Sequence, residues 1–169
     1  DGSLTKILLD VFKRFPDFNK VKKVYLYETS NFLKGFQKKI IKNKKIKWIK
    51  NFRNINNGPV IFFGNEFFDA IPIKQFKREK GFLFEKYYKF NKNNKIEEFF
   101  KRASKQDSLN INSYSSLRKL KFIEFPKYGF EELEKIIKKI LQLEGCLLLI
   151  DYGYLKPNNN NTLQSVMKH

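Results

Sequence analysis

The chain has 169 residues, the length of one ordinary domain. Hydrophobic residues make up 41% of it and aromatic residues 17%, so it can build a core, and its composition argues against disorder of the whole chain. Lys and Arg total 35 against 17 Asp and Glu, which gives a net charge of +18 and raises the question of an anionic partner.

The positive charge comes from 30 Lys and only 5 Arg, spread along the chain. Proteins that read phosphates or bases favour Arg, because its planar guanidinium binds them with two hydrogen bonds. We therefore interpret the charge as a solvated, compositionally biased surface and expect no nucleic acid partner, with a real anion-binding surface as the alternative.

Two residue types set further bounds on function. Cys146 is the only cysteine and His169 the only histidine, which argues against a disulfide framework, a metal site and a histidine-based catalytic triad. No apolar run is long enough to span a bilayer, and no signal peptide is recognisable. The sequence therefore predicts a soluble domain of a reducing compartment.

The first predicted element is an amphipathic helix over residues 4–15, which ends before Pro16 because proline cannot continue the helical hydrogen bonds. A short strand over 24–27 follows. Ser30 is the expected N-cap of a second helix, over 31–41, whose apolar side chains are predicted to face inward.

Two further strands are predicted before residue 64. Residues 46–49 form a short strand, and Asn-Asn-Gly at 56–58 is a turn signal. Residues 59–63 (PVIFF) are almost continuously apolar. Such a run is typical of a parallel strand that is buried on both faces.

The middle of the chain is predicted to be an insertion over about residues 73–120. Strands over 73–78 and 82–90 form a hairpin that turns near Lys80-Gly81. Residues 91–116 are polar and are predicted to be a loop with one weak helix, whose apolar positions are Ile96, Phe99, Phe100 and Ala103.

The last part of the chain predicts a helix over 131–142 with an acidic first turn, followed by Gly145 and a buried strand over 146–150. Helices that alternate with apolar strands predict an α/β fold with a mostly parallel sheet. The chain has no initiator Met, and its last residues carry no capping signal. We therefore expect residues 1–169 to be part of one domain, truncated at both ends.

Ligands of parallel α/β sheets bind at the carboxyl ends of the strands, so polar residues there are candidate site residues. Asp1, Gly2 and Ser3 precede the first helix, whose N-terminus favours a polar or anionic ligand. Glu28 ends the first strand, near the position where an acidic residue binds a ribose in nucleotide-binding folds. The alternatives are an ordinary turn at Gly2 and a solvated strand end at Glu28.

A denser group of polar and aromatic residues follows the 59–63 strand. Its members are Asn65, Glu66, Phe67, Phe68 and Asp69, and Asp151 and Tyr152 follow the last strand. Carboxylates among aromatic rings are costly to desolvate, which favours a functional role. If the segment turns helically after Asn65, Glu66 and Asp69 share a face and a pocket; Asp69 could instead only cap that turn.

The run GPVIFFGNEFFDAIPIKQF (Gly58–Phe76) resembles the signature of the MidA-like methyltransferases, the family of a mitochondrial complex I assembly factor and its bacterial relatives. Other segments resemble that family in order: DGSLTKILLDVFKRFP its glycine-rich cofactor loop and following helix, VYLYETS its acidic strand end, LLLIDYG its late strand, and TLQSVMKH the segment beyond. The resemblance covers most of the chain except about residues 91–120. The upstream strand and the first glycines of the loop are absent.

The resemblance implies a class I methyltransferase fold, which is Rossmann-like, and S-adenosylmethionine as the cofactor. It further implies methylation of a protein arginine on a subunit of NADH:quinone oxidoreductase, in the mitochondrial matrix or, for bacterial relatives, the cytoplasm. The expected cofactor-binding residues are Asp1, Gly2, Ser3 and Glu28. The expected catalytic residues are Asn65, Glu66 and Asp69, and the expected substrate-binding residues are Phe67, Phe68, Asp151 and Tyr152.

The missing upstream strand has a structural consequence. In class I methyltransferases that strand lies between the strands that we predict at 24–27 and 59–63. We therefore expect these two strands either to lie separated by an empty slot or to close up imperfectly. Either way, unpaired backbone groups and apolar side chains are left exposed, and we expect the fragment alone to be inactive.

Two other functions remain open. A nucleic-acid methyltransferase would place an Asn and aromatic residues at this strand end to hold a flipped base, but Glu66 and Phe67 occupy the positions of the prolines in its Asn-Pro-Pro motif. A catalytically silent assembly protein would keep the fold for partner binding alone. Binding of S-adenosylmethionine distinguishes the enzyme from the scaffold.

Overall fold

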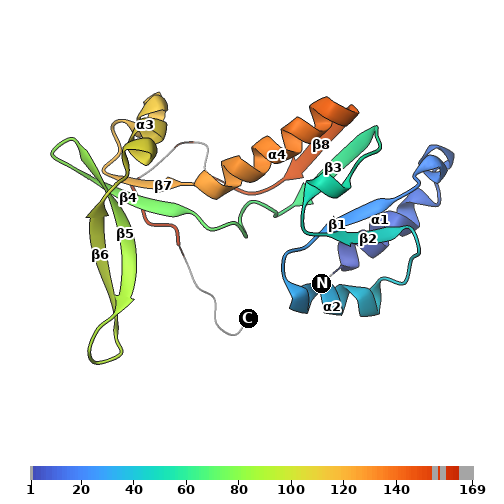
Figure 1. Cartoon of the computed structure of the whole chain (residues 1–169), viewed down its shortest axis with the longest axis horizontal. Coiled ribbons are helices and arrows are strands. Elements are labelled where there is room, and N and C mark those ends of the chain that lie inside the picture. The colour runs from blue at the N-terminus through green and yellow to red at the C-terminus, as the bar shows by residue number, and fades with distance from the viewer. Residues whose placement is uncertain (1, 154–155, 157–158, 164–169) are drawn as a thin grey trace. The chain divides into compact units, whose positions relative to one another are not determined.

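The computed structural model describes residues 2–153, 156 and 159–163 (Figure 1). The predicted cofactor residue Asp1 and most of the segment 162–169 lie outside the described residues. The chain divides into two compact units, Asp1–Pro59 and Val60–His169.

The first unit contains two helices, a parallel pair of strands and two 3-10 turns. In chain order these are α1 (Ser3–Phe12), the turn Pro16–Lys20, β1 (Val24–Tyr27), α2 (Asn31–Ile40), β2 (Ile46–Ile49) and the turn Phe52–Asn54. β1 and β2 pair in parallel from Val24 opposite Ile46 to Tyr27 opposite Ile49. The predicted helices and strands of this unit are therefore confirmed.

Local chemistry explains how these elements begin and end. The Ser30 hydroxyl accepts a hydrogen bond from the Leu33 amide at 3.2 Å, as expected of an N-cap. α1 ends at Phe12, earlier than predicted. Pro16 begins the 3-10 turn, where it is tolerated because the backbone nitrogen of a residue in the first turn donates no hydrogen bond within the helix.

The prediction that α2 buries its apolar face is wrong for most of that face. Phe32 is 81% exposed and Phe36 is 46% exposed, whereas Ile41, directly after the helix, is buried. The buried side chains of this unit instead follow α2 and continue through β2 and the second 3-10 turn: Ile41, Ile49, Phe52 and Ile55.

In the second unit, a parallel pair of strands packs against a long helix. β3 (Val60–Asn65) pairs with β8 (Gly145–Ile150), in register from Val60 opposite Gly145 to Asn65 opposite Ile150. α4 (Lys127–Leu143) contacts both strands. Among the described residues β1 pairs only with β2, and β3 only with β8, so β1 and β3 do not pair and each leaves one edge unpaired.

α4 and its strands depart from the prediction in two ways. The helix begins at Lys127, so its first turn carries no acidic residue, and of its expected inward residues Ile136 is buried whereas Leu141 is 78% exposed. β3 and β8 are not buried on both faces, since Ile61 and Leu148 are 66% and 51% exposed. An apolar sequence allows a strand to be buried on both faces, but α4 covers only one face of the β3–β8 pair.

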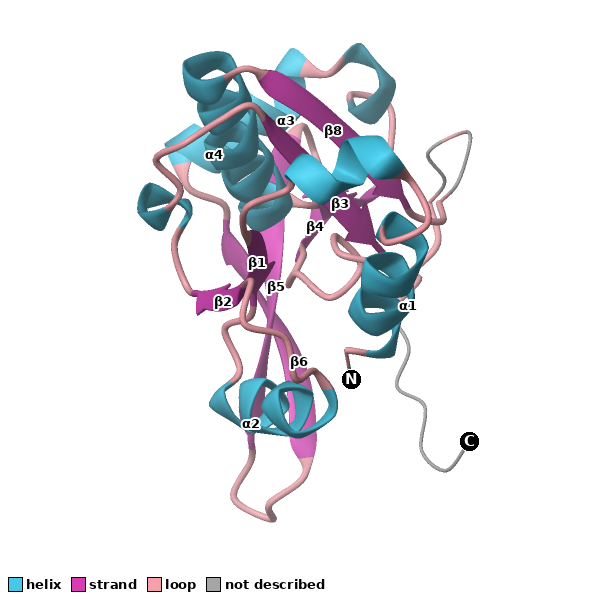
Figure 2. Cartoon of the chain, turned by 90° about the vertical axis from the view of Figure 1, so that its right-hand side faces the viewer, coloured by secondary structure: helices cyan, strands magenta, loops and turns pink. Residues whose placement is uncertain are grey.

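Four antiparallel strands form the other sheet of this unit, in the order β6-β5-β4-β7. They are β4 (Lys74–Glu79), β5 (Phe82–Phe90), β6 (Ile96–Arg102) and β7 (Phe122–Phe125). The predicted hairpin turn is confirmed, because Lys80 and Gly81 both have positive φ angles, of 46° and 80°. The far half of β5 and β6 projects as a two-stranded ribbon (Figure 1 and Figure 2).

The weak helix predicted around Ile96–Ala103 is wrong, since β6 occupies this segment. Its apolar spacing fits a helix, but pairing with β5 decides the conformation, and the Tyr87 and Phe99 rings stack across the two strands at 5.6 Å. The expected loop over 91–116 is also more ordered, because it contains α3 (Lys105–Ser113) and begins the turn Ser115–Leu117.

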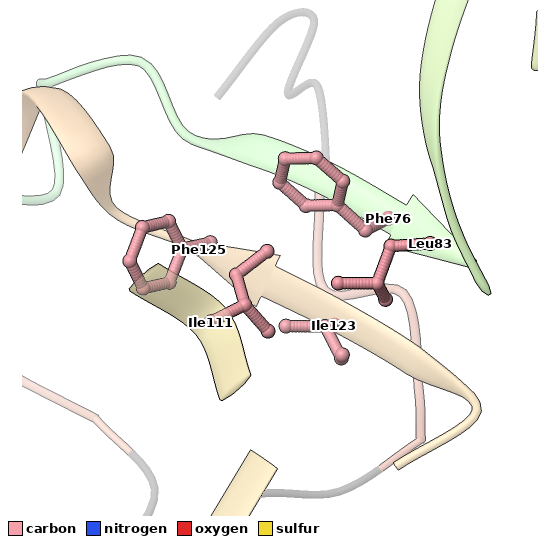
Figure 3. Close-up of a cluster of buried hydrophobic side chains, with 5 residues drawn as sticks. All are labelled: Phe76, Leu83, Ile111, Ile123 and Phe125. Carbon is pink, nitrogen blue, oxygen red and sulfur yellow. The ribbon is translucent and has the colours of Figure 1, made fainter. Parts of the chain in front are cut away.

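The core of the second unit lies between the antiparallel sheet and α3. Figure 3 shows its side chains converging from β4, β5, α3 and β7: Phe76, Leu83, Ile111, Ile123 and Phe125. All five are at most 3% exposed. This core therefore holds β4, the strand that follows the 66–73 loop.

Candidate functional site

The ends of β3 and β8 place two loops next to each other. The two strands are parallel and in register, and the Glu66 amide donates a hydrogen bond to the Ile150 carbonyl at 2.8 Å. Residues 66–69 and 151–152 therefore leave the same edge of the sheet, where α/β proteins bind their ligands.

Two hydrogen bonds join these loops across 83 residues of sequence. The Asp151 carboxylate accepts a hydrogen bond from the Phe68 amide at 3.1 Å, and the Tyr152 hydroxyl donates to the Asp69 carboxylate at 3.3 Å. The nearby charge of Asp69 and this hydrogen bond raise the pKa of Tyr152. The Tyr152 phenol therefore stays protonated and remains a hydrogen-bond donor at neutral pH.

The backbone after Asn65 does not take the helical turn that a shared face of Glu66 and Asp69 requires. Glu66 has a φ of 48°, in the left-handed region that is uncommon for residues other than glycine, and the first turn bond forms later, from the Ile71 amide to the Phe68 carbonyl. Glu66 and Asp69 therefore do not share one helical face. Asp69 is linked to the site through Tyr152 instead.

The aromatic residues of the loop pack inward, whereas its carboxylates are exposed. A Cβ atom added at Gly64 would lie 3.2 Å from the Cβ of Phe67, so Phe67 lies close against the end of β3. The Phe67 and Phe68 rings meet edge to face at 5.0 Å, and both residues are half-buried. Glu66 and Asp69 are exposed, so the expected desolvation of these carboxylates is not observed.

In the first unit, Glu28 at the end of β1 has a fixed orientation. Its two carboxylate oxygens accept hydrogen bonds from the Ser30 amide at 2.8 Å and from the Gln37 side-chain amide at 3.0 Å. Gln37 accepts in turn from the Trp48 indole at 2.8 Å. Glu28 is therefore not simply a solvated strand end.

Sequence reasoning missed Gln37 and Trp48. Gln37 stands out only as a neutral amide on a helix whose other long polar side chains, at 34, 38 and 39, are lysines. Its link to Glu28 spans nine residues and passes from helix to strand, so no local pattern reports it.

Gly2 lies beside the same glutamine. Its φ of 100° suits glycine, and a Cβ atom there would lie 2.8 Å from the Ile41 side chain and 3.3 Å from Cγ of Gln37. Gln37 therefore adjoins both Gly2 and Glu28, which brings the start of α1 and the end of β1 together, with Ser3 in the first turn. A helix N-terminus beside an oriented carboxylate fits a cofactor that carries a ribose.

Other parts of the described chain are less informative about function. A hollow of about 350 Å³, lined in part by Phe82, Arg102 and Asn112, contains none of the candidate site residues. The described residues include no group of three or more His, Cys, Asp or Glu side chains placed to hold a metal ion. No helix among them has both the length and the apolar character needed to cross a membrane.

Comparison with known proteins shows similarity to a protein family, to a curated protein and to a solved structure. Residues 1–169 match the family described as "Putative S-adenosyl-L-methionine-dependent methyltransferase". The chain is 29% identical to the mitochondrial "Protein arginine methyltransferase NDUFAF7 homolog" of Caenorhabditis elegans, over 97% of this chain and 44% of that protein. The chain thus spans less than half the length of this relative.

The chain is also similar to a solved structure, a COG1565 superfamily member from Burkholderia thailandensis bound to S-adenosyl-homocysteine. It aligns with a TM-score of 0.59 and 14% identity, over 79% of this chain and 35% of that one. At this identity the likeness shows a shared α/β fold.

Proposed function

The chain belongs to the family of S-adenosyl-L-methionine-dependent methyltransferases that matches all of its residues, and we propose that the protein transfers a methyl group to an arginine of a protein substrate. The name of the Caenorhabditis elegans relative, a protein arginine methyltransferase, supports this choice of acceptor. The proposed substrate is a subunit of NADH:quinone oxidoreductase. The proposed location is the mitochondrial matrix in a eukaryote, or the cytoplasm in a bacterium.

Gly2, Ser3 and Glu28 are the described residues proposed to hold the cofactor. When bound, S-adenosylmethionine supplies an electrophilic methyl group on a sulfonium. The Glu28 oxygens each accept one hydrogen bond from the protein and keep a lone pair for a ribose hydroxyl. Gln37 fixes the direction of these lone pairs, which lowers the entropic cost of binding.

The loops after β3 and β8 are proposed to hold the arginine. The observation that carries this proposal is the pairing of residues 66–69 with 151–152 at one sheet edge. Glu66 and Asp69 would orient the guanidinium through charge-assisted hydrogen bonds, with the Asn65 amide beside them. Phe67, Phe68 and Tyr152 would contact the apolar stem of the arginine, and a carboxylate would stabilise the charge that develops as the methyl arrives.

The experiment uses the protein in its natural length. Calorimetry measures its binding of S-adenosylmethionine, and mass spectrometry locates methyl groups on NADH:quinone oxidoreductase subunits after incubation with the cofactor. We expect saturable binding and a methylated arginine. Absence of binding would identify a silent assembly protein, and a methyl group recovered only on nucleic acid would identify the other alternative.

A further inference from the structure

β6 forms one edge of the antiparallel sheet, and its backbone is arranged to accept another strand. The Ala103 amide donates to the Leu83 carbonyl, and the Asn91 amide donates to the Lys95 carbonyl. Because antiparallel hydrogen bonding alternates, odd-numbered residues of β6 bond to β5 and even-numbered residues point their N–H and C=O groups away from it. The described residues offer no strand on that side.

The half of β6 that follows the hairpin turn belongs to a bare ribbon. β4 pairs with β5 only as far as Glu85, so residues 86–90 pair with β6 alone (Figure 1). The ribbon exposes several large apolar side chains: Tyr88, Phe90, Ile96 and Phe100. A two-stranded ribbon is marginally stable in water, and one more pair of strands would stabilise it.

The charges of β6 are divided along the strand. Glu97 and Glu98 lie near its beginning, and Lys101 and Arg102 end it. The strand contains neither Pro nor Gly, and its pairing with β5 is unbroken, so it lacks the bulges and prolines that block many edges. A strand with an acidic half and a basic half is complementary to an antiparallel copy of itself.

We propose that β6 is a self-association edge, where a second copy of this chain adds its own β6 in antiparallel orientation. With Phe99 opposite Phe99 of the second copy, Glu97 stands opposite Lys101 of the other chain on both sides of the two-fold axis. In the same register, residues 96 and 98, whose N–H and C=O groups point away from β5, stand opposite residues 102 and 100 of the second copy. This is the placement that the hydrogen bonds between the two copies require.

Side chains on one face of the joined sheet then form continuous rows. The stacked Tyr87 and Phe99 rings continue into the same two rings of the second copy. The neighbouring row alternates in charge, because Lys89 lies opposite Glu97 and Glu85 lies opposite Lys101 within each chain. Aromatic pairs and opposite charges are the cross-strand pairs that stabilise sheets.

The division of charge selects a second copy over other partners. A nucleic acid strand would meet Glu97 and Glu98 beside the aromatic rings, and an acidic peptide would be repelled by the same two residues. A second copy of β6 in antiparallel orientation places its basic half opposite the acidic half of the first copy, and its acidic half opposite the basic half.

The test measures self-association of the natural-length protein by sedimentation velocity across micromolar concentrations. We expect a dimer that Glu97→Lys and Lys101→Glu each weaken by roughly tenfold or more, because each change sets like charges opposite each other twice. Mixing the two variants should restore the dimer, since the lysine introduced at position 97 of one chain then meets the glutamate introduced at position 101 of the other. Lys92→Glu, an equal charge change at the exposed hairpin tip, should leave association unchanged.

The mixing experiment separates this edge from damage to the fold, which mixing would not repair. A wild-type protein that stays monomeric overturns the proposal and indicates that another segment covers β6. A dimer that neither variant weakens, or that mixing fails to restore, also overturns it. So does association that nuclease treatment abolishes.

Discussion

Glu28 shows how its neighbours orient a side chain whose role the sequence leaves open. Its carboxylate accepts from the Ser30 amide and from Gln37, and Gln37 also packs beside Gly2. A carboxylate that only ended a strand would not need both of its oxygens held by hydrogen bonds. The orientation supports a role in binding the ribose of the cofactor.

Glu28→Ala should weaken S-adenosylmethionine binding by about 1–3 kcal/mol, because charged hydrogen bonds to the ribose are lost. Calorimetry on the natural-length protein measures the change, and circular dichroism checks that the fold is kept. Asp17→Ala, which removes an exposed acid from the same unit, serves as the control. Unchanged affinity in the Glu28 variant would mean that this carboxylate only holds α2 in place and does not bind the cofactor.

Glu66→Gln should leave cofactor affinity intact but lower methyl transfer by about 10²-fold, or about 2.7 kcal/mol of barrier. The amide keeps the size of the side chain but loses the charge that we propose pairs with the guanidinium of the substrate. Glu79→Gln is the control, because Glu79 is exposed on β4, where it forms an ion pair with Lys77. Wild-type turnover of the Glu66 variant would remove Glu66 from the mechanism.

At the scale of elements, the pairing of β3 with β8 depends on one glycine. Gly145 has a φ of 148°, and a Cβ atom there would lie 1.8 Å from the Val60 carbonyl oxygen, on the residue directly opposite. The strand cannot shift to relieve this contact without losing the register that brings residues 66–69 and 151–152 together.

Gly145→Ala should therefore destabilise the second unit by about 3 kcal/mol or more, because backbone strain adds to the steric overlap. Urea unfolding followed by circular dichroism measures the loss. Gly153→Ala, where an added Cβ would meet nothing within 4 Å, should have little effect. Equal stability of the two variants would show that the β3–β8 pairing adjusts easily at Gly145.

At the scale of the whole molecule, a buried charge network connects four elements of the second unit, α3, β4, β5 and α4. Asp107 on α3 is 2% exposed and accepts from Lys74 of β4 at 3.1 Å and from Lys127 of α4 at 2.9 Å. Lys74 also pairs with Glu85 at 2.9 Å. Removing one partner from such a network leaves an uncompensated charge.

Burial opposes ionisation in this network, but the ion pairs outweigh it. Burial by itself would raise the pKa of Asp107, yet hydrogen bonds from Lys127 and Lys74 lower that pKa below its usual value. Burial would likewise lower the pKa of Lys74, yet its bonds to Glu85 and Asp107 raise that pKa above its usual value.

These shifts predict a stability plateau around neutral pH. The Asp107 contribution is present above its unfolded pKa of about 4 and is lost as pH falls through the lower folded value, because the unfolded state then binds more protons. The Lys74 contribution is present below its unfolded pKa of about 10.4 and is lost as pH rises through the higher folded value. Protonating the 17 acids also leaves 35 Lys and Arg unbalanced, which adds repulsion in acid.

Urea midpoints measured from acid to alkaline pH check this expectation. In Asp107→Asn, the urea midpoint should fall less steeply as the pH is lowered on the acid side of the plateau, since one titrating group with a lowered pKa is gone. Asp17→Asn is the control, because Asp17 lies in the other unit, is exposed and lies 3.7 Å from the exposed Lys20 amine. An unchanged fall of the urea midpoint in acid for Asp107→Asn would mean that the network does not govern stability at low pH.

The sequence by itself predicted the elements whose signals are local. The Ser30 cap, the Lys80-Gly81 turn and the apolar runs of β3 and β8 depend on residues close together in the chain, and all four are present in the structure. The group at the strand ends was also predicted, because parallel strands place their carboxyl ends at one edge.

Only the tertiary structure decided the features that depend on distant partners. β6 is a strand because β5 lies beside it, and α2 leaves most of its apolar face exposed because the core of its unit continues through β2 instead. The bonds from Gln37 to Glu28 and from Tyr152 to Asp69 likewise join separate elements. Periodicity reports which conformation a segment favours alone, whereas pairing and packing across the chain determine which conformation, and which side-chain contacts, have the lowest free energy.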